Sequence, residues 1–142
     1  MYHKILLAYD GSAQAAAALR QSADLAGLCN AELHLLGIVA TSGSAALGAA
    51  YGSADFFGME LKFFEEALQT AIDNLSELVS VQTRIREGDP AEQIAAHAHE
   101  VGADLAVIGH SDKGLLVRWF EGSTGANLLR ALPCSLLIAT EK

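Results

Sequence analysis

The sequence predicts an α/β protein with a parallel sheet and helices on both sheet faces. Short apolar runs alternate with segments of helical periodicity, in the order β-α-β-α-β-α-β-α-β. The first run, Ile5–Ala8, is continuously apolar and bounded by turn residues, as is typical of a strand buried on both faces. Alternating elements of this kind imply parallel strands joined by right-handed crossovers.

The first strand, Lys4–Tyr9, is closed by the turn residues Asp10-Gly11-Ser12. Ser12 is a favourable N-cap, and the alanine-rich segment that follows it favours a helix as far as Ala26. Gly27 is expected to end this helix, because glycine is common just beyond helix C-termini.

A second strand is predicted at Glu32–Val39. The segment Ala40–Asp55 is rich in Gly, Ala and Ser without periodicity, and we interpret it as a mobile excursion of a kind that is often functional. An amphipathic helix is expected over Phe56–Leu78. Its apolar residues recur every three or four positions: Leu61, Phe64, Leu68, Ile72 and Leu75.

The third strand, Val81–Arg86, alternates apolar and polar residues, which indicates a sheet edge. Asp89 and Pro90 then open a helix as N-cap and first helical residue. Gly102 is expected to end it. The inward-facing positions of this helix are Ile94, Ala98 and Val101.

The last third of the chain holds the strongest functional pattern. The apolar run Leu105–Ile108 stops at Gly109, a polar loop follows, and Gly122-Ser123-Thr124 opens a helix that reaches Leu132. A final strand is expected at Ser135–Ala139. Small hydroxyl residues at a helix start favour anions, because free N–H groups and the helix dipole point at them. In such sheets, ligands bind at the carboxyl ends of strands where the strand order reverses.

Composition narrows the class of protein. A chain of 142 residues with 51% hydrophobic residues predicts one globular domain, residues 1–142. The formal net charge of −8 argues against nucleic acid or an anionic membrane as partner. No apolar stretch is long enough to span a bilayer, and the N-terminus reads directly as a strand, so we expect a cytoplasmic protein. Cys29 and Cys134 are expected to be reduced, buried thiols.

The sequence offers no constellation for catalysis or metal binding. His97 and His99 are two residues apart on a helix and therefore face different sides, which makes them poor joint ligands. No Ser-His-Asp or Cys-His spacing and no outstanding carboxylate pair can be identified. We therefore expect a protein that is not an enzyme; a slow ATPase would need a base and a positioned water that we cannot name.

Four segments together resemble the universal stress protein family over nearly the whole chain. They are Ile5–Ser12, Arg86–Pro90, Ala103–Gly109 and Leu132–Ile138. The resemblance implies a flavodoxin-like, adenine nucleotide alpha hydrolase-like three-layer sandwich with strand order 3-2-1-4-5. It also implies a homodimer formed through the C-terminal edge strand, which an apolar edge favours.

Members of that family that bind ATP carry the motif G-x2-G-x9-G-S/T. Gly109 and Gly122-Ser123 match its outer positions, but the middle glycine is replaced by Asp112. An aspartate there adds a side chain and a negative charge, which repels a triphosphate unless a cation such as Mg²⁺ bridges them. Gly114 lies out of register with the motif.

The resemblance assigns a role to the remaining positions of the implied site. Ala8 and Asp10 would meet the adenine, and Ile38 would give backbone contacts to the base. Ile108 and Gly109 would border the ribose, and Ser123 and Thr124 would offer hydroxyl and N–H groups to the phosphates. The leading hypothesis is binding of ATP or another adenine nucleotide in stress response or regulation. The alternative, which Asp112 favours, is a dimeric interaction protein of the same family that binds no nucleotide and docks partners through Ala40–Asp55.

Overall fold

The computed structural model describes residues 1–9, 13–39, 53–75, 79–109 and 128–140. The strands within these ranges are β1 (Lys4–Ala8), β2 (Glu32–Val39), β3 (Val81–Glu87), β4 (Leu105–Gly109) and β5 (Ser135–Ala139). The helices are α1 (Ala13–Cys29), α3 (Ser53–Asp73) and α4 (Pro90–Val101). A further short helical segment spans 128–131.

The strands form one parallel sheet in the order β3-β2-β1-β4-β5, which confirms the predicted fold class and strand order. The central strand β1 carries the apolar run that predicted burial on both faces. Ile5, Leu6 and Leu7 have no exposed surface. The apolar run therefore identified the middle of the sheet correctly.

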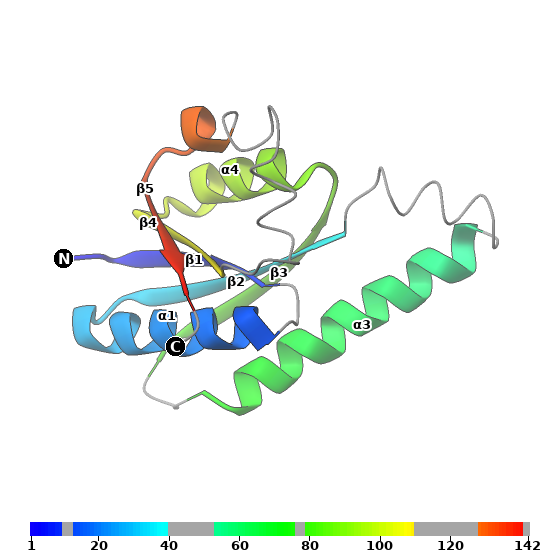
Figure 1. The fold of residues 1–142 in the computed structure, drawn as a ribbon, viewed down its shortest axis with the longest axis horizontal. Helices are drawn as coiled ribbons and strands as arrows, with labels where there is room; N and C mark the ends of the chain where they lie inside the picture. Colours follow the sequence, from blue (N-terminus) through cyan, green and yellow to red (C-terminus); the bar gives the residue numbers. More distant parts are fainter. Residues whose placement is uncertain (10–12, 40–52, 76–78, 110–127, 141–142) are drawn as a thin grey trace.

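Helices lie on both sides of the sheet (Figure 1), and an apolar cluster lies between the sheet and the helices on each side. Helices α1 and α3 cover one face, where β1 contributes Ile5 and Leu7. Helix α4 and the segment 128–131 cover the other face, where β1 contributes Leu6 and Ala8. We call the second surface the α4 face. Successive residues of a strand point to opposite faces, so the two clusters take alternate residues of the same strands.

Both edge strands are where the sequence predicted them. β3 forms one edge, and its side chains are partly buried or exposed, as its polar alternation indicated. β5 forms the other edge and leaves Leu137 and Ile138 37% and 43% exposed. The chain thus has one polar and one apolar sheet edge.

Helix α4 begins and ends as predicted, whereas α1 ends later than predicted. Asp89 caps α4 by accepting a hydrogen bond from the Glu92 N–H (3.1 Å), and Gly102 ends it in the left-handed conformation. The prediction that Gly27 ends the first helix is wrong. Helix α1 continues through Gly27 to Cys29, and Asn30, with φ of 54°, takes the left-handed position instead. Asparagine is the residue that most readily replaces glycine there.

Three smaller expectations also need correction. The second helix was expected over Phe56–Leu78, but α3 starts at Ser53, inside the predicted Ala40–Asp55 excursion, and ends at Asp73. Leu75 lies in a bend after a turn at Asn74, a residue that favours turns. The two free cysteines, Cys29 and Cys134, are partly buried rather than buried, because each lies at the end of an element. The last described helical residue before β5 is Ala131 rather than Leu132.

The amino ends of the two central strands are tied together by Asp104. Its carboxylate accepts hydrogen bonds from the N–H groups of His3 (2.8 Å) and Lys4 (3.1 Å). Its own N–H donates to the Lys4 carbonyl (3.0 Å). These bonds pair the backbone groups at the start of β1 with Asp104, so these groups are not available to a ligand at the amino end of the sheet.

Candidate nucleotide site and its polar border

The strand order reverses at β1, and this is where a doubly wound sheet binds ligands. β1 pairs with β2 on one side and with β4 on the other, so the connection after β1 runs towards β2 and the connection after β4 runs the opposite way, towards β5. At such a point the loops after the two neighbouring strands diverge and leave room above the carboxyl ends. The carboxyl ends of β1 and β4 are therefore the place to examine for the predicted site.

Three of the predicted site residues, Ala8, Ile38 and Ile108, come together on the α4 face. Ala8 and Ile108 are register partners at the ends of β1 and β4, and Ile38 lies near the end of β2. Their side chains belong to one apolar cluster and are 7%, 6% and 3% exposed. Because these side chains are packed inward, their backbone and the outer surface of the cluster are what they can offer a ligand.

Gly109 follows directly after Ile108 at the end of β4 and is only partly buried. It has no side chain to cover the strand end, so another molecule can approach its backbone closely. Together with the small Ala8, Gly109 gives the described ends of β1 and β4 small groups on the α4 face. Such a surface suits a flat aromatic ring, which gains from contact with apolar groups.

The other predicted site residues lie outside the described ranges. They are Asp10, Asp112, Gly122, Ser123 and Thr124. The structure therefore brings together the part of the predicted site that would contact the base and ribose. The roles given to the part that would contact phosphates stay predictions.

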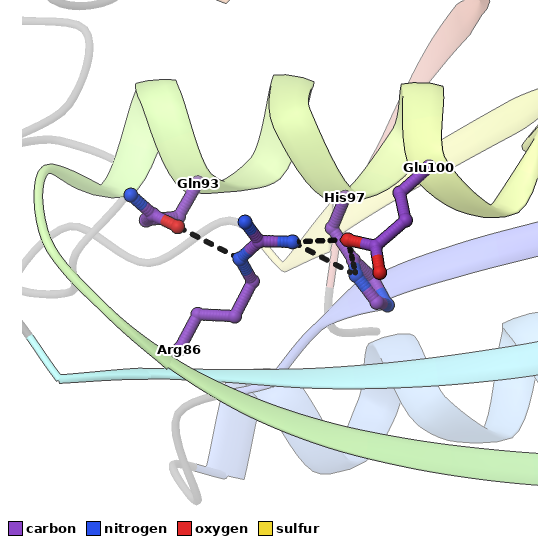
Figure 2. Close-up of polar contacts among 4 residues, drawn as sticks. All are labelled: Arg86, Gln93, His97 and Glu100. Atoms are coloured by element: carbon purple, nitrogen blue, oxygen red, sulfur yellow. Dashed lines mark hydrogen bonds and ion pairs between the residues drawn. The ribbon is translucent and has the colours of Figure 1, made fainter.

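A polar cluster that the sequence analysis missed borders this centre. We call it the polar border, and it consists of Arg86 on β3 and Gln93, His97 and Glu100 on α4 (Figure 2). Arg86 is the register partner of Ile38, so the border begins one strand away from the predicted base contact. The spacing of the three α4 residues, four and then three positions, was the available signal, because such residues share one helix face.

Arg86 holds the polar border together by reaching along α4 (Figure 2). Its Nε donates to Gln93 Oε1 (2.8 Å), and its Nη1 donates to Glu100 Oε2 (2.6 Å). The same Nη1 lies 3.4 Å from His97 Nδ1. One guanidinium thus bonds side chains along the length of α4, which its fixed fork of donors makes possible.

The turn before α4 depends on a glycine. Gly88 has φ of +141°, a conformation that side chains rarely adopt. A Cβ at this position would lie 2.6 Å from Gln93 Nε2. Gly88 therefore both permits the turn and leaves room for the Gln93 side chain that Arg86 requires.

Burial and charge act on the ionisable groups of the polar border. Burial lowers the pKa of His97 below its ordinary value of 6.5, partly opposed by the nearby Glu100 carboxylate. The hydrogen bond from Arg86 lowers the pKa of Glu100.

Two further groups lie outside the polar border. A second buried histidine, His34 on β2, lies 3.2 Å from the carboxylate of Glu32. Near the opposite edge, burial raises the pKa of the Cys134 thiol.

The histidines of α4 face different sides, as predicted: His97 is buried and His99 is exposed. Within the described ranges, no group of three or more His, Cys, Asp or Glu side chains is arranged to hold a metal ion. None of the helices in the same ranges is long and apolar enough to cross a membrane.

A groove of about 500 Å³ lies on the opposite face, between α3 and the edge strand β3. Leu68 and Ile72 of α3 and Thr83 and Arg84 of β3 are among its lining residues. No pattern in the sequence indicated this groove. It is separate from the predicted site, because it lies beside the sheet edge rather than at the ends of the central strands.

Comparison with known proteins agrees with the fold and the motifs. The sequence model of the Universal stress protein family matches residues 1–140. A curated protein of Staphylococcus haemolyticus that carries the universal stress protein name is 30% identical over 145 residues, covering 96% of this chain and 84% of that protein.

Among solved structures, a universal stress protein in complex with cAMP is 25% identical, with a TM-score of 0.64, and the match covers 98% of this chain and 97% of that one. The universal stress protein UspA from Lactobacillus plantarum is 23% identical with a TM-score of 0.74 over 97% of each chain, which shows a common fold.

Proposed function

The chain belongs to the universal stress protein family, and from this premise we propose that it binds an adenine nucleotide at the carboxyl ends of β1 and β4. The observation that carries the proposal is the meeting of Ala8, Ile38 and Ile108 in one cluster at the reversal of strand order. The related protein crystallised with cAMP supports the same ligand class. Cytoplasmic action in stress response or regulation stays part of this proposal.

The described residues fit the base end of such a ligand. Ala8 and the backbone of Ile38 would contact the adenine, together with Asp10 of the adjoining turn. Ile108 and Gly109 would border the ribose. This division agrees with the burial of the Ile38 side chain, which leaves its backbone as the group available to a ligand.

The phosphate end rests on the sequence motif. Gly122, Ser123 and Thr124 would offer N–H and hydroxyl groups to the phosphates, and Asp112 would lie where the motif has its middle glycine. Mg²⁺ supplies the charge that allows a carboxylate and a triphosphate to lie close together. We therefore propose ATP with Mg²⁺, or a nucleotide with fewer phosphates, as the ligand.

Calorimetric titration of the protein with ATP, ADP, AMP and cAMP, each with and without Mg²⁺, tests this proposal. We expect saturable binding of at least one nucleotide. Absence of heat with all four at millimolar concentration would contradict it.

Two variants of the motif separate the effects of the aspartate. Asp112→Asn removes the charge and keeps a side chain, whereas Asp112→Gly also restores backbone freedom. If charge repulsion limits binding, both should bind ATP more tightly than the wild type, and Mg²⁺ should matter less to them. If backbone approach is the limit, only Asp112→Gly gains affinity.

We propose binding without turnover, since the sequence offers no base for hydrolysis. Incubation of the protein with ATP and Mg²⁺ should release no phosphate above the level given by the protein after heat denaturation. Sustained release in proportion to the folded protein would contradict this part of the proposal.

A second candidate function, a dimeric interaction protein that binds no nucleotide, is favoured by Asp112 and by the apolar edge at β5. Leu137 and Ile138 are exposed on that edge, where a second copy could pair. We propose that the homodimer forms there, and sedimentation should then show a dimer that Ile138→Lys converts to a monomer. Mass spectrometry of the purified protein discriminates the two functions, because a retained nucleotide excludes the second.

A further inference from the structure

His97 is a buried titratable group for which the proposed nucleotide site has no use. It is 5% exposed and lies between α4 and the polar edge of the sheet. The neighbouring residues of α4, Ile94 and Ala98, are packed into the apolar cluster of the α4 face. His97 is therefore held in place by the same contacts that dock α4 on the sheet.

The contact with Arg86 favours a neutral ring for His97. Arg86 Nη1 lies 3.4 Å from His97 Nδ1, and a guanidinium can only donate hydrogen bonds. The contact is a hydrogen bond only if Nδ1 carries no proton, and on this basis we assign His97 a neutral ring with its proton on Nε2. Glu100 is the group that favours a proton on His97: its Oε2 lies 3.7 Å from Nδ1 and accepts from Arg86 at 2.6 Å, but burial outweighs this attraction and the pKa of His97 is lowered.

The surroundings of His97 carry more positive than negative groups. β3 contributes Arg84 and Arg86, β2 contributes His34, and α4 contributes Glu100. Beyond these, Glu32 is paired with His34, and Lys4 starts the α4 face of β1 as the register partner of Glu32. A proton on His97 would thus place a new charge beside two arginines, with one half-exposed carboxylate to offset it.

We propose that Arg86 and His97 form a proton-sensitive latch that holds α4 against β3 at neutral pH and releases this helix at mildly acidic pH. Protonation of Nδ1 replaces the acceptor of the Arg86 hydrogen bond with a positive charge. The bond is lost, two like charges face each other, and the contacts of α4 nearest to β3 open. The latch is independent of nucleotide binding.

The pH range of this effect follows from the direction of the pKa shift. Burial holds the pKa of folded His97 below 6.5, so below that pH the unfolded chain binds more protons than the folded one. Stability contributed by His97 is therefore complete above about pH 6.5 and is lost as the pH falls towards the folded pKa. The carboxylate Glu100 titrates lower and does not account for a loss in this range.

Paired asparagine substitutions on the same helix test the latch. In His97→Asn, the amide oxygen takes the approximate place of Nδ1 and accepts from Arg86 without titrating. The matched control is His99→Asn, since His99 is exposed two residues away on α4. Amide hydrogen exchange, corrected for the intrinsic pH dependence, should be measured from pH 7.5 to 5 for α4 and, as an internal reference, for α1.

In the wild type and in His99→Asn, α4 should lose protection relative to α1 as the pH falls. In His97→Asn the ratio should stay constant. The same pH-dependent loss in all three proteins would overturn the proposal, as would equal loss in α1 and α4 of the wild type.

A measurement on the unmodified protein keeps the proposal testable if His97→Asn does not fold. The Cε1–H resonance of His97 can be followed by NMR over the same range. Its midpoint should lie below the ordinary histidine value of 6.5, and α4 amide shifts should change with the same midpoint. A His97 resonance with a midpoint at or above 6.5 would overturn the proposal, as would α4 amides that do not respond.

Discussion

The α4 face is apolar at its centre and polar at its border, and the two parts hold α4 by different means. At the centre, Ala8, Ile38 and Ile108 lie among leucine, isoleucine and alanine side chains. At the border, Arg86 bonds Gln93 and Glu100 through charged and amide groups. Apolar burial is nearly independent of direction and pH, whereas hydrogen bonds to charged groups depend on both.

This difference suggests that the two parts of the α4 face have different roles. The apolar centre lies where the strand order reverses, at the strand ends where we propose that the nucleotide binds. The polar border lies over the edge strand, where fewer apolar side chains are available, and it fixes α4 through directed bonds. The account predicts that damage at the centre costs more stability than damage at the border, and that the border alone responds to pH.

The largest effect is expected for Leu128→Ala, which creates a cavity at the centre. Leu128 is fully buried in the cluster of the α4 face. The substitution should lower the free energy of unfolding by about 2–5 kcal/mol. Its neighbour provides the control, since Leu129 is 58% exposed and Leu129→Ala should change the value by less than about 0.5 kcal/mol. Urea unfolding measures both, and equal losses would contradict the assignment of the centre.

An intermediate effect is expected for Gly88→Ala at the start of the border. The backbone strain at φ of +141° should cost about 1–3 kcal/mol, and the new Cβ would displace Gln93 from Arg86. Gly27→Ala is the matched control, because Gly27 lies in α1 with nothing within 4 Å of an added Cβ. This control should gain about 0.5–1 kcal/mol through helix propensity. Thermal unfolding should show a lower Tm for Gly88→Ala and a higher Tm for Gly27→Ala than for the wild type. Shifts of the same sign in both variants would contradict this prediction.

The smallest effect is expected for Glu100→Gln at the exposed end of the border. Arg86 lowers the pKa of Glu100 below its ordinary value of 4.5, so the carboxylate contributes stability above that pH and loses it as the pH falls. Acid unfolding of the wild type should therefore be steeper below pH 4.5 than that of Glu100→Gln. High salt should reduce the difference. Glu66→Gln, on α3 and away from the cluster, should follow the wild type.

The strands and their order could be predicted because a strand that is buried on both faces needs a continuous run of apolar residues. The continuous apolar run Ile5–Ala8 predicted a central strand, and the polar alternation of β3 predicted an edge, and the burial of both strands agrees. The limits of α4 were equally readable, since Asp89, Pro90 and Gly102 act through local geometry. The end of α1 could not be predicted from the sequence. A helix can continue through a glycine at a loss of about 1 kcal/mol in stability, and Asn30 adopts the left-handed conformation that ends the helix.

The two parts of the α4 face were unequally predictable for the same reason. The positions of Ala8, Ile38 and Ile108 followed from the ends of apolar runs and a family motif. The polar border needs a strand side chain and a helix face to meet across the sheet edge, and no local pattern places Arg86 beside Gln93. The spacing of Gln93, His97 and Glu100 was visible, but its partner was not.

The most direct test of the nucleotide proposal is an NMR titration that reports binding and location together. Backbone amide signals of the labelled protein are followed as AMP, and then ATP with Mg²⁺, is added. The account predicts saturable shifts at Ala8, Ile38, Ile108 and Gly109, with little change at His3 and Asp104 at the amino end of the sheet. No shift at millimolar nucleotide would contradict it, and so would shifts confined to the groove between α3 and β3.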